Sequence, residues 1–230
     1  MVGGIKRSEA RSILVLAVLI ALAGCSLTYP AQPQPISESG ATIVPLETKQ
    51  DWVTYGDVLM AFRVTSEKEI PPSKEEVDRG EGTITRQVTA QQSEGDVLWT
   101  RPSRSSDQPL PVPTWTIADG GWIFHGNDRQ PLTVAGREPL TVGGEYIAIR
   151  TFARIGGDDT REWFSMQYFP VQDARIHFSD TSVLIPDLKS VQDLSVTDFI
   201  AMLNKVPPDP CAVPYMSLDP VDRYHRVVDA

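Results

Sequence analysis

Alternating apolar residues are the feature that most limits what this chain can fold into. Residues 58–65 alternate, and residues 83–91 do so again through Ile84, Val88 and Ala90. Successive side chains of a β-strand point to opposite faces, so this period of two predicts half-buried strands. In the first strand, one face collects Val58, Met60, Phe62 and Val64.

Further short segments between residues 51 and 178 continue this β pattern. Residues 118–121 (ADGG) and 156–159 (GGDD) look like hairpin turns, the first joining 115–117 to 122–124 and the second joining 145–155 to 161–168. A charged loop is expected over 66–82. Many short strands separated by turn signals predict a mainly β domain, a small OB-like barrel or a sandwich. The remaining predicted strands are 96–100, 175–178 and 182–185.

One amphipathic helix is expected near the C-terminus, over 196–205. Ser195 and Asp198 have the spacing of a capping box, with Asp in the usual Glu position. Val196, Phe199, Ile200 and Leu203 follow helical spacing, and Pro207 and Pro208 then end the helix. The Pro-rich segment 207–230 is expected to be a tail that wraps the surface or frays.

The N-terminus has the layout of a secretory signal. Lys6, Arg7 and Arg11 precede an unbroken apolar run over residues 13–23, and Gly24 and Cys25 follow it. A charged region, an apolar region and small residues in that order are typical of a removable signal peptide. A run of eleven residues is shorter than the roughly 20 that a membrane-spanning helix needs.

The residues Leu22-Ala23-Gly24-Cys25 resemble the lipobox of bacterial lipoproteins. The resemblance implies that lipid is attached to Cys25 and that residues 1–24 are removed. Two or more acyl chains anchor a protein stably to a bilayer. The expected product is exported and lipid-anchored at the outer face of the cell membrane, or in the outer membrane of a Gram-negative host. The expected organisation is a signal peptide (1–24), a flexible tether (25–50), a β-rich domain (51–206) and the tail (207–230).

A second resemblance covers about 90 residues of the β-rich part. Segments 57–67, 88–102 and 142–146 (VGGEY) look like those of uncharacterised actinobacterial lipoproteins, and the first strands are similar to those of small five-stranded OB-type barrels, including netrin modules. This resemblance implies a fold and supplies no chemistry.

Charge limits the partners of the chain. The sequence carries a net charge of −9, and removal of the basic N-terminus makes the product more acidic. Nucleic-acid binding needs a Lys/Arg surface that neutralises phosphates, so we expect no nucleic-acid partner. The same acidity opposes adhesion to an anionic bilayer through charge, which leaves the lipid on Cys25 as the expected membrane contact.

No motif of catalytic or cofactor chemistry stands out, so the sequence predicts neither catalytic, cofactor-binding nor metal-binding residues. The three His (His125, His177 and His225) lack the spacing of a zinc site, and neither a GxSxG elbow nor a phosphate-binding glycine loop is present. Asp158 and Asp159, with Glu162 nearby, could hold calcium, although a solvated turn is the ordinary interpretation of such a pair.

Five Trp and one Cys are the remaining candidates. On a β-surface, Trp residues could stack on sugar rings, but Trp within a strand more often fills the core, and Trp115 could pair with Trp122 across the expected hairpin. With Cys25 consumed by lipid, Cys211 is left to form an intermolecular disulfide or to act as a small, partly buried residue. The full Trp set is Trp52, Trp99, Trp115, Trp122 and Trp163.

These observations together favour a non-enzymatic, membrane-anchored protein that binds an envelope protein or glycan. An inhibitor-like or accessory module for an exported enzyme is one alternative, with residues 66–82 as its contact. A hydrolase whose residues converge only in the folded chain is the other. A deep pocket with convergent polar groups and perturbed pKa values would favour the enzyme, whereas a flat apolar patch rimmed by polar groups would favour the binding protein.

Overall fold

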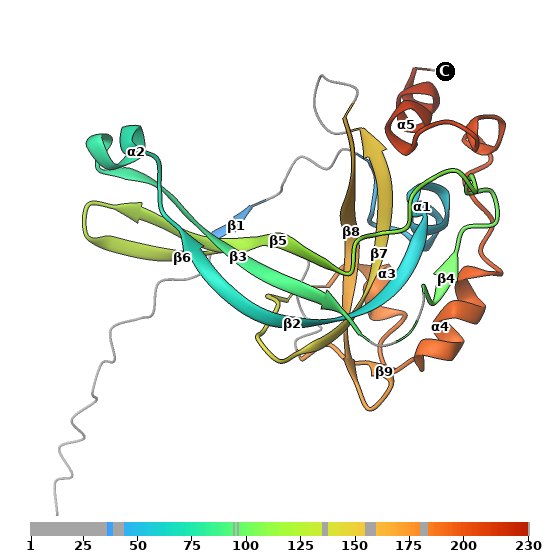
Figure 1. Cartoon of the computed structure of the whole chain (residues 1–230), viewed down its shortest axis with the longest axis horizontal. Coiled ribbons are helices and arrows are strands. Elements are labelled where there is room, and N and C mark those ends of the chain that lie inside the picture. The colour runs from blue at the N-terminus through green and yellow to red at the C-terminus, as the bar shows by residue number, and fades with distance from the viewer. Residues whose placement is uncertain are drawn as a thin grey trace, which may run out of the picture. The chain divides into compact units, whose positions relative to one another are not determined.

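A single sheet dominates the computed structural model, which describes residues 36–38, 44–93, 95, 97–134, 138–154, 160–179 and 184–229 (Figure 1). Its strands run in the order β1-β6-β5-β3-β2-β7-β8-β9, with β4 paired to β2 beside this path. All pairs are antiparallel except β1 with β6. The strands are β1 (Ile36–Glu38), β2 (Val58–Ile70), β3 (Glu81–Gln92), β4 (Trp99–Thr100), β5 (Thr114–His125), β6 (Asp128–Val134), β7 (Glu145–Arg154), β8 (Arg161–Gln172) and β9 (Arg175–Ile176).

The sheet curls so strongly that strands far apart in the order face each other. Four strand spacings separate β5 from β8, or roughly 19 Å in a flat sheet. Nevertheless, the Tyr168 hydroxyl on β8 donates to Asp119 Oδ1 on β5 at 2.7 Å. Of the two architectures expected, the barrel-like one is therefore present, as an antiparallel half-barrel, and the prediction of a mainly β fold with a C-terminal helix is confirmed.

The inner face of this half-barrel carries an aromatic core. Phe62 on β2 stacks on Tyr146 of β7 with ring centroids 5.3 Å apart and also contacts Trp115 of β5. Trp115 is the cross-strand partner of Ala90 on β3, the strand that lies between β2 and β5. As the alternation predicts, Val58, Met60, Phe62 and Val64 are all fully buried.

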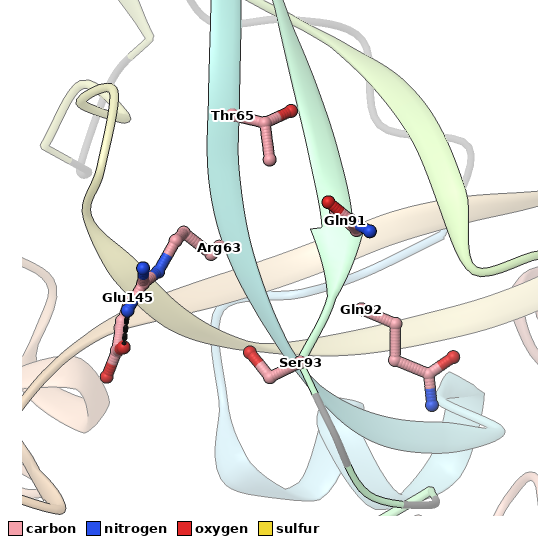
Figure 2. A pocket seen from close by; sticks show the side chains of 6 residues that line it. All are labelled: Arg63, Thr65, Gln91, Gln92, Ser93 and Glu145. Atoms are coloured by element: carbon pink, nitrogen blue, oxygen red, sulfur yellow. Dashed lines mark hydrogen bonds and ion pairs between the residues drawn. The ribbon is translucent and has the colours of Figure 1, made fainter.

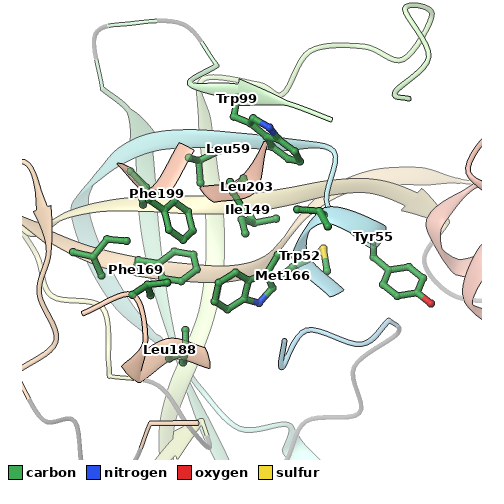
Figure 3. Packing of buried hydrophobic residues seen from close by; sticks show 14 of the residues in the cluster. Trp52, Tyr55, Leu59, Trp99, Ile149, Met166, Phe169, Leu188, Phe199 and Leu203 are labelled. Carbon is green, nitrogen blue, oxygen red and sulfur yellow. The ribbon is translucent and has the colours of Figure 1, made fainter. Parts of the chain in front are cut away.

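Helices cover the outer face and build the larger core (Figure 3). Trp52 packs edge-on against Phe169 of β8 at 5.1 Å, and Phe199 lies 4.8 Å from the same ring. Leu59 and Ile149 point into this cluster from the sheet. The helices are α1 (Lys49–Tyr55), α2 (Lys74–Arg79), α3 (Pro186–Lys189), α4 (Val196–Leu203) and α5 (Pro220–Val228), with a short 3-10 turn η1 (Val213–Tyr215).

The helix predicted over 196–205 is α4. Ser195 caps it, because the Ser195 hydroxyl oxygen accepts from the Asp198 amide at 3.0 Å, while the Asp198 carboxylate accepts from that hydroxyl at 2.7 Å. The buried side of the helix presents Phe199 and Leu203 to the core, as the spacing predicts.

Replacing Ser195 by Ala should destabilise the domain by about 1 kcal/mol, since the Asp198 amide then loses its acceptor. Urea denaturation followed by tryptophan fluorescence measures this loss. Replacing Ser106 by Ala, in an exposed loop, is the matched control and should change stability by less than about 0.5 kcal/mol. An equal effect of the two variants would contradict the capping role.

The prediction of a hairpin turn at residues 118–121 is wrong. Strand β5 runs unbroken through these residues and pairs with β3 on one side and β6 on the other. Gly120 and Gly121 have φ values of 68° and 140° and form a bulge opposite residues 85–87 of β3, where a Cβ on Gly121 would lie 2.0 Å from the Ile84 carbonyl oxygen. The turn lies instead at Gly126, and Trp115 and Trp122 share one strand.

The structure agrees with the strand pairing predicted for the second hairpin but not with the loop predicted over 66–82. Strands β7 and β8 pair in the predicted antiparallel manner, although the turn residues 156–159 lie outside the described part of the chain. The loop expected at 66–82 is largely regular: β2 continues to Ile70, α2 follows with a Ser73–Glu76 capping box, and β3 begins at Glu81. Among the late strands, β9 is shorter than predicted, and residues 180–183 are not described.

The two ends of the domain extend beyond the segment expected to be globular. Residues 36–38, within the expected tether, pair with the edge of β6, and Val44 is buried in the outer core. Helix α1 begins at Lys49, before the expected boundary at residue 51. In the expected tail, Ala212 and Arg223 are both fully buried, so η1 and α5 belong to the folded structure.

Candidate functional site

Buried polar atoms without a hydrogen-bond partner single out one region of the molecule. Seven such side-chain atoms occur in the described residues, and all of them belong to one group of six side chains. Because more than nine in ten buried polar groups in native proteins are satisfied, a local concentration of exceptions calls for an explanation. We call this group the tryptophan–arginine cluster; it consists of Arg104, Gln108, Trp115, Arg150, Trp163 and Ser165.

Arg150 is the centre of the cluster. It follows Tyr146 and Ala148 on the inner face of β7, and its side chain is almost fully buried. The guanidinium carbon lies 4.1 Å from the ring centroid of Trp115 and 5.8 Å from that of Trp163. One nitrogen, Nη2, donates to the Trp163 carbonyl at 3.2 Å, whereas Nε and Nη1 have no partner.

No carboxylate among the described residues pairs with Arg150. The buried carboxylate of Asp57, whose amide donates to the Arg150 carbonyl, is paired with Arg101 at 2.7 Å and also accepts from the Phe152 amide at 2.8 Å. Burial alone lowers the pKa of Arg150 to about 10, which still leaves the group charged at neutral pH. Among the described residues, the buried positive charge on the inner face is therefore compensated only by the Trp115 and Trp163 rings and one carbonyl.

The neighbouring strands supply the rest of the cluster. Ser165 is the cross-strand partner of Arg150 on β8, and Trp163 precedes it by two residues on the same face. Trp115 comes from the start of β5 across the curl. In both Trp side chains the indole Nε1 is buried and unpartnered, as is the Ser165 hydroxyl.

A loop of residues 101–113 covers one side of the cluster. Arg104 places its guanidinium carbon 5.8 Å from the Trp163 ring centroid and donates to the carbonyls of Gln108 and Pro109. The Arg104 Nε and the Gln108 Oε1 are buried without partners. The loop thus adds a second guanidinium and an amide to the group.

The hollows found among the described residues lie elsewhere and lack such unpartnered atoms. A hollow of about 320 Å³ between β2, β3 and β7 is lined by polar side chains, and its one charged pair, Arg63 with Glu145, is half exposed (Figure 2). A smaller one of about 150 Å³ reaches Arg86 and Asp119, which pair with each other at 2.7 Å. A third hollow, of about 410 Å³, lies beside α5 and is lined by Leu218, Asp222, His225, Arg226 and Asp229. None of the three contains a buried polar atom without a partner, so it is the unpartnered atoms that make the tryptophan–arginine cluster the candidate.

The sequence candidates are distributed unevenly around this site. Trp115 and Trp163 belong to it, Trp52 and Trp99 fill the core, and Trp122 lines the smaller hollow. The sequence reasoning missed Arg150, which has no motif around it; a charged residue inside the apolar alternation of 145–155 was the available signal.

The metal and thiol candidates lie elsewhere or outside the described residues. His125, His177 and His225 are exposed, and the first two lie near Glu81 and Asp193 respectively. Cys211 is exposed and unpaired. The structure does not describe Cys25, Asp158 or Asp159, and its described part contains no group of three metal-ligating side chains.

Chemically, the cluster combines two aromatic faces with a fixed positive charge and several N–H donors inside the sheet. Such a group can hold an oxygen-rich ligand by stacking and hydrogen bonding. None of the helices in the described part of the chain has the length and apolar character to cross a membrane. No protein family, curated protein or solved structure matches this chain.

Proposed function

We propose that this protein is an exported lipoprotein, anchored at the cell surface or in the outer membrane through lipid on Cys25, that binds an envelope ligand without transforming it. The observation that carries the binding role is the tryptophan–arginine cluster with its seven unpartnered polar atoms. Leaving a buried polar group unsatisfied costs about 1–3 kcal/mol, so a bound ligand that satisfies several of these atoms would recover a large free energy.

An envelope glycan suits this site better than a protein partner. The cluster lies within the curl of the sheet and its polar atoms are buried, whereas a stable protein interface needs roughly 1,000 Å² or more of accessible surface. A single sugar offers a flat ring face for Trp115 or Trp163 and hydroxyl oxygens for the surrounding donors. Of the five Trp residues that could stack on a sugar, this proposal therefore assigns the role to Trp115 and Trp163.

The absence of catalysis is part of the proposal. General acid–base chemistry needs a titrating group within hydrogen-bond reach of the reacting atoms. The six residues of the cluster include neither a carboxylate nor a His. The described His side chains are exposed and lie on β5, after β9 and on α5, away from the cluster.

Tryptophan fluorescence of the mature protein in detergent micelles tests the binding role. Titration with monosaccharides of the envelope should change the emission, and replacing Trp115 or Trp163 by Leu should remove the response. Replacing Trp122 by Leu is the matched control, since Trp122 lies on β5 outside the cluster. A response that survives in the Trp115 and Trp163 variants would exclude this site.

The anchor has its own test. Cells given an alkyne-labelled fatty acid should incorporate the label into the wild-type chain and into a Cys211→Ala variant, because only Cys25 follows a lipobox. The Cys25→Ala variant should carry no label and should retain residues 1–24 by intact-mass measurement. Labelling of the Cys25→Ala variant would contradict lipid attachment at this residue.

One observation favours the accessory-module alternative. Helix α2 and the strand ends beside it form the far end of the β2–β3 hairpin, and none of the α2 residues is buried (Figure 1). Replacing Val77, an exposed apolar residue on α2, by Asp should abolish capture of a partner enzyme by in-cell crosslinking if this function holds. Unchanged crosslinks would exclude α2 as the contact.

A further inference from the structure

We infer that the ligand carries an anionic group, a carboxylate or a phosphate, which binds Arg150 beneath the loop of residues 101–113. This inference rests on the proposed function and names the chemistry of the ligand. Three features of the described residues lead to it: the charge of Arg150 without a counter-charge, the excess of unpartnered donors and the way the loop is attached.

The positive charge of Arg150 is buried without a counter-charge among the described residues. Transferring a cation from water into a protein interior is costly unless a counter-charge and hydrogen bonds accompany it. Arg150 is 1% exposed and has neither a carboxylate partner among the described residues nor partners for Nε and Nη1. An apolar side chain could fill this position without the free-energy cost of burying a charge. A binding anion explains why the position holds a guanidinium.

The unpartnered atoms have the composition expected for an anion site. Five of the seven are nitrogen donors with no acceptor capacity: Nε of Arg104, Nε1 of Trp115, Nε and Nη1 of Arg150, and Nε1 of Trp163. A neutral sugar hydroxyl brings a donor with every acceptor, whereas carboxylate and phosphate oxygens only accept when ionised. The excess of donors therefore favours an anionic ligand over a neutral one.

The loop provides a route to these atoms. Residues 102–112 form hydrogen bonds only among themselves and with Arg101 in the described structure. The two ends are fixed, by the buried Arg101–Asp57 pair and by the Gln92 amide bonded to the Pro113 carbonyl at 2.7 Å. Lifting the middle of the loop breaks no hydrogen bond to the sheet, and such locally weak segments open at low cost.

The loop would also close on the ligand. Arg104 and Gln108 move with it, so closure brings the Arg104 Nε and the Gln108 amide toward the ligand held by Arg150. Two guanidinium groups would then face one anion, and Trp163 would lie against both of them. Binding should accordingly weaken as salt is added.

The experiment is isothermal titration of the full mature protein in detergent at low salt. Its four probes are glucuronate, glucose 1-phosphate, inorganic phosphate and glucose. We expect glucuronate or glucose 1-phosphate to bind at least tenfold more tightly than glucose. The Arg150→Met variant should lose that preference, and Arg150→Lys should retain part of it. Arg129→Met, which removes an exposed guanidinium paired with Glu69, should bind like the wild type.

Each outcome decides a different part of the account. Preference for glucuronate or for glucose 1-phosphate identifies carboxylate or phosphate as the group, and binding of inorganic phosphate alone identifies a free anion. Equal affinity for glucose and the charged sugars would overturn the anion inference and leave glycan binding intact. Binding of no probe would overturn both proposals. Anion binding that Arg150→Met leaves unchanged would overturn the assignment to Arg150, provided that circular dichroism shows the variant to be folded.

Discussion

Replacing Asp57 by Ala should destabilise the domain by about 3–5 kcal/mol, the effect typical of removing one partner of a buried ion pair. Asp57 and Arg101 are 0% and 3% exposed at their side chains, with 2.7 Å between them. The Asp57 carboxylate also accepts from the Thr151 hydroxyl and the Phe152 amide. Its loss leaves the buried Arg101 guanidinium without its counter-charge and the Phe152 amide without an acceptor, at the junction of α1, β2 and β7.

Urea denaturation followed by circular dichroism measures this effect, and an exposed pair supplies the control. Lys74 and Asp78 form an ion pair on α2 with side chains 85% and 61% exposed. Replacing Asp78 by Ala should cost less than about 1 kcal/mol. A double variant, Asp57→Ala with Arg101→Met, should recover part of the lost stability. Equal costs for the Asp57 and Asp78 variants would contradict a structural role for the buried pair.

Replacing Arg150 by Met should stabilise the ligand-free protein by about 1–3 kcal/mol, because it removes a buried cation that lacks a counter-charge. For a domain of this size, each kcal/mol raises the melting temperature by roughly 2–4 °C. The gain is limited by the loss of the contact with Trp115 and of the hydrogen bond to the Trp163 carbonyl. Differential scanning calorimetry of the two proteins without added ligand measures the shift.

Arg223 is the matched control for this prediction, since it is equally buried but fully satisfied. Its guanidinium donates to the backbone carbonyls of Thr54, Tyr215, Met216 and Leu218, which ties α5 and η1 to α1. Replacing Arg223 by Met should therefore destabilise the protein by about 2–4 kcal/mol, as several buried acceptors lose their donor. Destabilisation of similar size by both variants would show that Arg150 serves packing rather than binding.

The sequence predicted the elements whose signals are local. The alternation in β2 predicts which four of its side chains are buried on the inner face: Val58, Met60, Phe62 and Val64. The cap residue Ser195 and the apolar spacing after it predict α4. The capping boxes at Thr48–Asp51 and Ser73–Glu76 carry the same kind of local signal, and α1 and α2 begin there, in segments expected to be tether, strand or loop.

Features that depend on distant contacts could not be read from the sequence. Gly120 and Gly121 carry the composition of a turn, and only the pairing of β5 with both β3 and β6 makes them a bulge. In the sequence, Arg150 is a single charged residue within a strand. Its contact with Trp115 exists only because the sheet curls. The cluster is a property of the tertiary fold, so nothing in the sequence distinguishes Trp115 and Trp163 from the other Trp residues.

A crystal structure of the mature protein soaked with glucuronate tests the central claim most directly. The account predicts a carboxylate oxygen 2.7–3.2 Å from Arg150 Nε or Nη1, with the sugar against Trp115 or Trp163 and the loop of residues 101–113 closed over it. Ordered water molecules alone at all seven unpartnered atoms, with glucuronate present at saturating concentration, would contradict it.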